Sequence, residues 1–282
     1  SLLDRTWLQS SRVHLFRLVS LNQHNVDDFT SLVISSKSTI PPFVKQLELA
    51  PEHVDSRWLR RLIPFLEVLT SVTVLHISNV EWSCLYSSSR HNFLSTFSPT
   101  VTDLHICNME FEQFTDVLDI ICASPMLTSI SLDTVVWHHS SFKFASATGK
   151  QLPPSVKHLR LRSCSIRNVV NWLLSHSSVP IVHHLDAGPL GETDTLLLGN
   201  YLIMLGSDLL SLKLEFENAG DSMHTCAGAM AIKSVPSSEL VATRSNIAGR
   251  YGKRGSPYSD IVTCTNLTLL TGLRTIHIDH FI

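Results

Sequence analysis

Histidine is the residue type in this chain with the clearest capacity for chemistry. The 282 residues include 15 histidines, and His76 and His105 occupy the same place in two similar sequence segments. Imidazole nitrogen is a common zinc ligand. If the two segments form neighbouring parallel strands, the two side chains stand about 4.8 Å apart. Because no third ligand has an obvious placement, we favour a surface pair in a binding face over a zinc site.

The adjacent histidine pairs do not suggest a metal site. His138 and His139 are consecutive, as are His183 and His184. Successive side chains of a regular strand point to opposite faces, so neither pair can chelate one ion from a strand. The basic stretch 249–255 places three charges among glycines, and we expect a flexible loop there rather than a phosphate or localisation patch.

Catalytic signatures are missing from the sequence. It contains no G-x-S-x-G, H-E-x-x-H, G-x-x-x-x-G-K-[ST] or G-x-G-x-x-G motif. We therefore expect a protein that is not an enzyme and that has no catalytic residues, no cofactor and no metal.

Composition excludes several classes of partner. Lys plus Arg number 22 and Asp plus Glu 24, a formal net charge of -2, so no overall positive field attracts nucleic acid or anionic membranes. No apolar stretch approaches the roughly 20 residues that cross a bilayer. The six cysteines form no C-x-x-C pair and have mainly apolar neighbours, which indicates reduced, buried thiols. We expect a cytoplasmic or nuclear protein that binds neither nucleic acid nor membrane.

The elements that would position polar side chains follow from a repeat. The pattern L-x-x-L-x-L, with Leu, Ile or Val at most apolar places, recurs eight times. Its copies start at 44, 72, 101, 127, 156, 182, 209 and 273. All spacings except the last fall between 26 and 29 residues, at or near the top of the range for leucine-rich repeats.

Each copy predicts one strand preceded by one helix. The fourth and sixth places alternate with polar residues, as in a half-buried strand. Helical spacing of apolar residues appears between the strands, and prolines precede most strands, where they end a helix and favour extended backbone. The predicted helix faces are Trp58, Leu62, Phe65, Leu66 and Leu69, then Phe114, Val117, Leu118 and Ile121, then Val169, Val170, Leu173 and Leu174.

These units predict an α/β leucine-rich-repeat solenoid, horseshoe-like, with parallel strands on the concave face and helices on the convex face. The alternative is a doubly wound α/β domain, whose strands would be continuous apolar runs and whose first turn usually carries glycine. The first glycine here is Gly149. The predicted strand core is Leu47, Leu49, Leu75, Ile77, Leu104, Ile106, Ile130, Leu132, Leu159, Leu161, Leu212 and Leu214.

The turns after the strands depart from the common repeat. Many such repeats have Asn or Cys three residues after the last strand leucine, where its side chain bonds turn backbone. Here only Cys164 fits. We therefore expect these turns to satisfy their backbone groups by water or local turns, and the stacking to be irregular.

The third and fifth places of each copy should project from the concave face. They mix both charge signs with uncharged hydrogen-bonding groups, which suits a protein partner better than a polyanion. The candidate partner-binding residues are Glu48, His76, Asp103, His105, Ser131, His158, Arg160, Asp186, Lys213 and His277.

The first residues resemble part of a known family. The segment Trp7-Leu8-x-x-Ser11-Arg12-x-x-Leu15-Phe16 is similar to the last helix of the F-box in fungal F-box/leucine-rich-repeat proteins. The alternative is an amphipathic helix that caps the array. The match covers about twenty residues, and the repeat spacing extends it loosely over most of the chain.

The resemblance implies the substrate receptor of a cullin-RING ubiquitin ligase. In that family the F-box binds the S-phase-kinase-associated adaptor and the repeats hold the protein to be ubiquitinated. The first two F-box helices are not in this sequence, so we expect adaptor binding only if an F-box lies upstream. The remnant that would contribute to it is Trp7, Leu8, Arg12, Leu15 and Phe16. The competing function is a structural or general protein-interaction array without a ligase link.

These patterns divide the chain into four parts. We expect an F-box remnant and cap at 1–22, repeats at 23–216, a flexible insertion at 217–259 and a final repeat at 260–282. The insertion holds five of the eleven glycines and few large apolar side chains to offset the entropy of ordering. It is either a functional loop or an error in the gene model.

Overall fold

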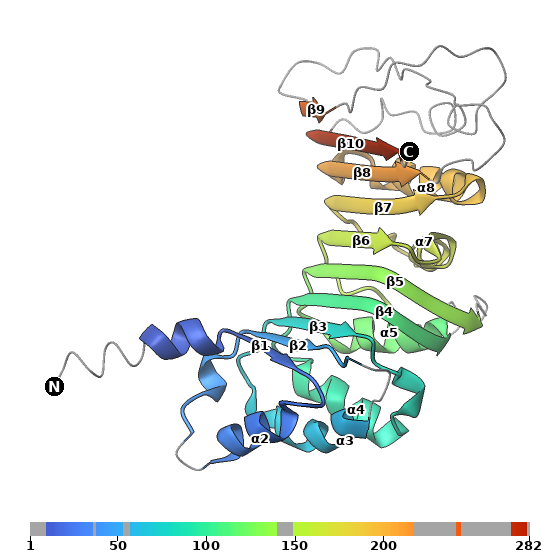
Figure 1. The fold of residues 1–282 in the computed structure, drawn as a ribbon. Helices are drawn as coiled ribbons and strands as arrows, with labels where there is room; N and C mark the ends of the chain where they lie inside the picture. Colours follow the sequence, from blue (N-terminus) through green and yellow to red (C-terminus); the bar gives the residue numbers. More distant parts are fainter. Residues whose placement is uncertain are drawn as a thin grey trace, which may run out of the picture. The chain divides into compact units, whose positions relative to one another are not determined.

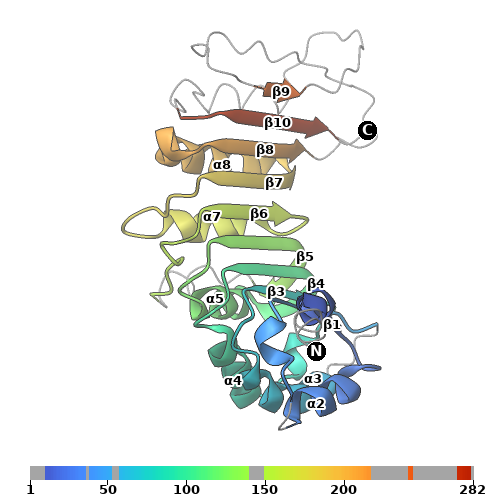
Figure 2. The same cartoon turned by 90° about the vertical axis from the view of Figure 1, so that its left-hand side faces the viewer.

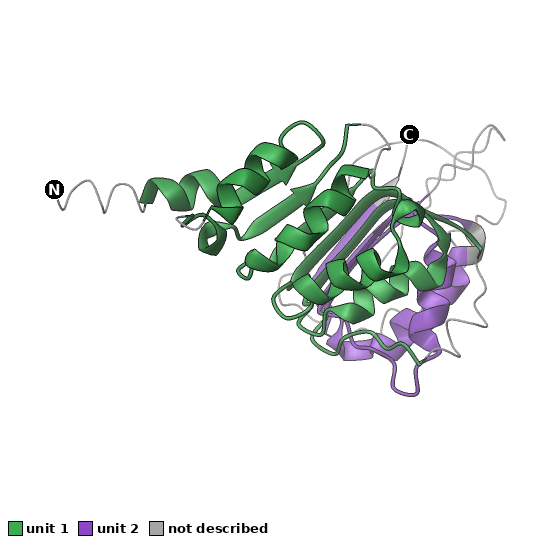
Figure 3. Ribbon diagram, turned by 90° about the horizontal axis from the view of Figure 1, so that it is seen from below, with its two compact units in different colours: residues 1–156 green, residues 157–282 purple. Residues whose placement is uncertain are grey.

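The computed structural model describes residues 10–35, 38–52, 57–139, 149–216, 241–243 and 272–280. The chain divides into two compact units, 1–156 and 157–282 (Figure 3). Both units have parallel strands and helices, which confirms the α/β class with a parallel sheet.

The sheet of the first unit contains β1 to β5 in chain order (Figure 1). The strands are β1 (Leu18–Leu21), β2 (Gln46–Leu49), β3 (Val74–Ser78), β4 (Asp103–Gln113) and β5 (Ser129–His139). All pair in parallel, and each pairing aligns the same place of consecutive repeats. Leu47, for example, lies opposite Leu75, which lies opposite Leu104.

The second unit repeats this arrangement. Its strands are β6 (His158–Arg162), β7 (His184–Leu190), β8 (Ser211–Phe216), β9 (Val241–Thr243) and β10 (Thr275–His280). The order is β6-β7-β8-β10-β9, and all the pairings among them are parallel. Strand β10 pairs directly with β8 and aligns His277 with Lys213, which both occupy the fifth place of their copies. Apart from β9, the predicted insertion 217–259 lies outside the described residues.

Helices cover one side of the sheet in each unit (Figures 1 and 2). In the first unit, residues 10–16 are helical and precede α2 (Val26–Ile34), η1 (Pro41–Phe43), α3 (Arg57–Leu62), η2 (Ile63–Val68), η3 (Trp82–Cys84), α4 (Ser87–Phe97) and α5 (Phe114–Ala123). The second unit has α7 (Ile166–Leu174), α8 (Glu192–Leu205) and η4 (Gly206–Asp208). No helix within the described ranges covers the other side.

The core lies between the strands and the helices. Every predicted strand core residue is at most 4% exposed. The apolar faces of α5 and α7 also bury their predicted residues, except that Leu174 is half-buried. The repeat pattern requires alternate strand residues to be buried against the apolar face of a helix. Both units of the structure show this burial.

The helical face predicted for 55–70 is partly wrong. The helix α3 changes at Ile63 into the 3-10 helix η2, which has Pro64 near its start. Proline lacks an N–H, and a 3-10 helix has three residues per turn, so the residues after it rotate away from the α-helical face. Leu66 is buried as predicted, whereas Phe65 is 37% exposed.

The predicted turns are also different. Residues two places after the last strand leucine have positive φ in four successive repeats, namely Asn79, Asn108, Thr134 and Ser163. Beyond Asn108 and Thr134 the strands continue, and Met109 pairs with Val135. Asn108 Nδ2 donates to Asn79 Oδ1, so the asparagine side chains of two consecutive repeats are bonded to each other. They lie one place before the position where Asn or Cys is common in leucine-rich repeats.

Threonine hydroxyls connect repeats at the other end of the strands. Thr73 Oγ1 donates to the carbonyl of Lys45 (3.3 Å) and Thr128 Oγ1 to that of Thr102 (3.1 Å). Thr102 Oγ1 lies 3.2 Å from the carbonyl oxygen of Thr73 and shares its hydrogen between that oxygen and Asp103 Oδ2. We call these three residues the threonine ladder. It adds side-chain contacts to carbonyl oxygens that also accept backbone N–H groups where each strand begins.

The four cysteines among the described residues are less buried than expected. Cys84, Cys107, Cys122 and Cys164 are all half-buried. Burial raises the pKa of the Cys122 thiol to about 12, and its Sγ lies 3.2 Å from the carbonyl oxygen of Gln151. A thiol with so high a pKa is a poor nucleophile at neutral pH.

Candidate functional site

The candidate site is the side of each sheet that no described helix covers, which we call the open face. Parallel pairing places side chains of equivalent places in columns across the strands. In the first unit the third-place column is Leu18, Gln46, Val74, Asp103 and Ser129, and the fifth-place column is Ser20, Glu48, His76, His105 and Ser131.

The fifth-place column of the first unit contains the predicted histidine pair. The rings of His76 and His105 are stacked, with centroids 4.0 Å apart and planes 14° from parallel. Gln46 Nε2 lies 3.4 Å from His76 Nε2. Burial lowers the pKa of His76 below its usual 6.5, and the nearby Glu48 carboxylate opposes this shift. His76 therefore presents an uncharged ring near neutral pH.

One residue predicted for this face contributes little surface. Ser131 is only 5% exposed, although its register place is as expected. Its side chain is short and stands beside the larger imidazole of His105, so neighbouring atoms cover it. Glu48, His76, Asp103 and His105 are half-buried and remain accessible.

The second unit contains another histidine stack that sequence reasoning did not identify. The rings of His158 and His184 lie 4.2 Å apart with planes 2° from parallel. Both residues occupy the third place of consecutive copies, so the rule that paired His76 with His105 could have found them. Burial first, and then the neighbouring His158 and His183, lower the pKa of His184.

A charged cluster occupies the open face of the second unit. Arg160 Nε is 3.7 Å and Arg162 Nη2 is 2.7 Å from the Asp186 carboxylate. Arg162 also pairs with Glu215, which is 8% exposed. Arg162 and Glu215 occupy the seventh place of their copies, beyond the two places from which the binding residues were chosen. Lys213 and His277, both predicted for the face, align on β8 and β10.

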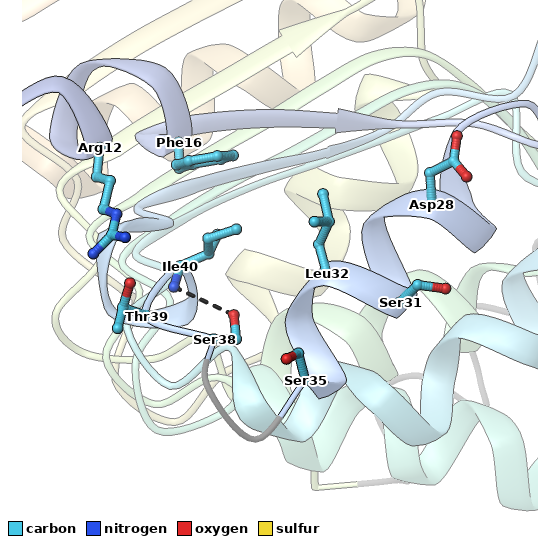
Figure 4. A pocket seen from close by; sticks show the side chains of 9 residues that line it. All are labelled: Arg12, Phe16, Asp28, Ser31, Leu32, Ser35, Ser38, Thr39 and Ile40. Carbon is cyan, nitrogen blue, oxygen red and sulfur yellow. Dashed lines mark hydrogen bonds between the residues drawn. The ribbon is translucent and has the colours of Figure 1, made fainter. Parts of the chain in front are cut away.

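The predicted adaptor-binding remnant lies beside an open depression in the first unit (Figure 4). Arg12 and Phe16 line it with residues of α2 and of the segment 38–40, and its volume is about 820 Å³. Leu15, on the same helix, is 69% exposed. Trp7 and Leu8 lie outside the described residues.

The described residues offer no obvious reaction centre. Among them, no group of three or more His, Cys, Asp or Glu side chains is placed to hold a metal ion. The stacked pairs therefore have no third His, Cys, Asp or Glu ligand among the described residues. Within the same part of the chain, no helix combines the length and apolar character needed to span a membrane.

Comparison with known proteins gives no relative. No family model matches the chain, and neither a curated protein nor a solved structure is similar to it. The open face must therefore be interpreted from its own residues.

Proposed function

We propose that this chain is a leucine-rich-repeat solenoid that acts as a non-catalytic protein-recognition module through its open face. The observation that carries this proposal is the alignment of polar third-place and fifth-place side chains on parallel strands. Such columns give a broad surface of mixed charge and hydrogen-bonding capacity on a rigid sheet. Parallel sheets are usually covered on both sides, so a polar, uncovered side favours use in binding.

The competing interpretation is a structural array without a partner. It is tested by affinity capture from cells that express the protein, with quantification of each captured protein. The strand-face variant combines His105→Ala with His158→Ala, and its matched control combines His14→Ala with His91→Ala on exposed helical positions. Proteins lost with the first variant and retained with the second support recognition through the open face. If no captured protein distinguishes the two variants while both remain folded, the proposal fails.

We further propose that the recognised protein is a ubiquitination substrate, as the resemblance of residues 7–16 to an F-box implies. The exposure of Leu15 supports this, because an apolar side chain exposed on a helix is suited to a protein contact. The test is co-purification of the S-phase-kinase-associated adaptor with the endogenous gene product tagged at its C-terminus. We expect Leu15→Asp to reduce adaptor recovery without changing recovery of open-face partners. If the adaptor does not co-purify, the array works without this ligase.

A further inference from the structure

We propose that the open face of the first unit binds a basic segment of a partner protein, with Lys or Arg side chains spaced along an extended chain. This rests on the proposed function, because it names the chemical class of the partner for one part of the open face. The evidence is the charge of the strands, its contrast with the second unit and the spacing of the carboxylates.

The strands of the first unit contain acidic residues but no lysine or arginine. The strands contain five carboxylates, Glu48, Asp103, Glu110, Glu112 and Asp133. Asp103 accepts a hydrogen bond from Thr102 at 2.7 Å, and Glu110 lies 3.7 Å from His138. Neither of these two contacts is with a lysine or an arginine.

The second unit is different, because its strand charges balance one another. Its strands carry the cations Arg160, Arg162 and Lys213, together with the acidic residues Asp186, Glu215 and Asp279. Arg162 pairs with both Asp186 and Glu215. The overall net charge of -2 therefore hides a local excess of negative charge on the first unit's strands.

The spacing of the carboxylates fits an extended basic chain. Glu48 is on β2 and Asp103 on β4, two strands apart, so they are separated by at least about 10 Å across the sheet. An extended chain advances about 3.3 Å per residue, so basic residues three or four places apart can reach both carboxylates. His76 on β3 lies between them and stacks on His105 of β4, and a guanidinium group can stack on a flat ring. Half-buried Val74 offers apolar contact for the alkyl part of a Lys or Arg side chain.

The experiment measures binding of a fluorescein-labelled peptide of repeated Arg-Ser-Ser triplets to the full chain by fluorescence anisotropy. A peptide of Glu-Ser-Ser triplets is the comparison. We expect the Arg peptide to bind and the Glu peptide not to bind. Combining Glu48→Gln with Asp103→Asn should weaken binding by at least about tenfold, the loss typical of a single charge-assisted hydrogen bond.

A matched control separates recognition from general charge attraction. Asp28→Asn with Glu67→Gln removes the same charge from exposed helical positions of the same unit, and we expect a change below about twofold. Equal weakening by the two double variants, or equal binding of the two peptides, would overturn the inference. If the captured proteins still depend on His105 and His158 while the Arg peptide fails to bind, the recognition function stands and only the basic partner is wrong.

Discussion

Arg162 on β6 and Glu215 on β8 form an ion pair that crosses the intervening strand β7. The residue of β7 between them is Gly188, which pairs with Arg162. A Cβ atom at 188 would overlap the Cβ and the carbonyl oxygen of Glu215. The glycine therefore leaves the space through which the two charged side chains meet.

Removing Arg162 should destabilise the second unit strongly. The side chains of Arg162 and Glu215 are 13% and 10% exposed, so Arg162→Leu leaves a nearly buried carboxylate without its cation. We expect a loss of about 3–5 kcal/mol in the free energy of unfolding, measured with urea. Adding Glu215→Leu should restore part of it, because the nearly buried carboxylate is then gone, while Asp186 keeps only its contact with Arg160. A double variant as unstable as Arg162→Leu would contradict this account.

Substituting Gly188 tests the space itself. Gly188→Ala should reduce the free energy of unfolding by about 1–3 kcal/mol, because the added methyl group overlaps Glu215 and forces the strands to shift. Urea denaturation monitored by circular dichroism measures the loss. A stability equal to that of the wild type would show that β7 and β8 can separate without cost.

Neighbouring residues of η2 should respond very differently to truncation. Leu66 is fully buried, and Leu66→Ala should cost about 2–5 kcal/mol through lost contacts and a cavity. Phe65 is 37% exposed, so Phe65→Ala should lower the free energy of unfolding clearly less than Leu66→Ala does, although phenylalanine is the larger side chain. Thermal or urea unfolding ranks the two variants. The reverse order would mean that the α-helical face inferred from the sequence is the correct one.

The threonine ladder should contribute modestly to stability. Thr128→Val keeps the side-chain shape but removes the hydroxyl that donates to the Thr102 carbonyl. We expect a loss of about 0.5–1.5 kcal/mol in the free energy of unfolding. Thr96→Val is the control, since Thr96 donates only within its own helix α4, to the carbonyl of Asn92. Equal effects of the two substitutions would exclude a special role for the ladder.

Stability should fall as the pH drops below about 6.5 because of the histidine stacks. The pKa of His184 is lowered by burial and by His158 and His183, and that of His76 is lowered by burial. A lowered histidine pKa means that the unfolded chain takes up protons before the folded one, so stability present above the unfolded pKa of about 6.5 is lost towards the folded values. His184→Asn should lessen the fall in unfolding free energy between pH 7.5 and pH 5. A wild type and a variant with parallel pH profiles would contradict this.

Much of the strand layer follows from the sequence alone. The apolar fourth and sixth places, recurring every 26–29 residues, predict both the buried residues and their alignment on neighbouring parallel strands. The prediction succeeds because successive side chains of a strand point to opposite faces. If the residue at one place is buried, the side chain at the next place points away from the core. The stack of His76 on His105 follows from the same rule.

Only the tertiary structure decided what the local pattern does not encode. The positive φ of Asn108 lets β4 continue with Met109 and Phe111 in the core. The buried places of β4 thereby shift by one residue, and Met109 pairs with Val135 of the next repeat. The 3-10 helix η2, with Pro64 near its start, leaves Phe65 exposed, whereas a continuous α-helix would have placed it inward. Arg162 meets Glu215 because Gly188 lies between them, a contact set by side-chain volume across three strands. Periodicity records which face of one element is buried, whereas these features depend on which side chain the adjacent strand brings into contact.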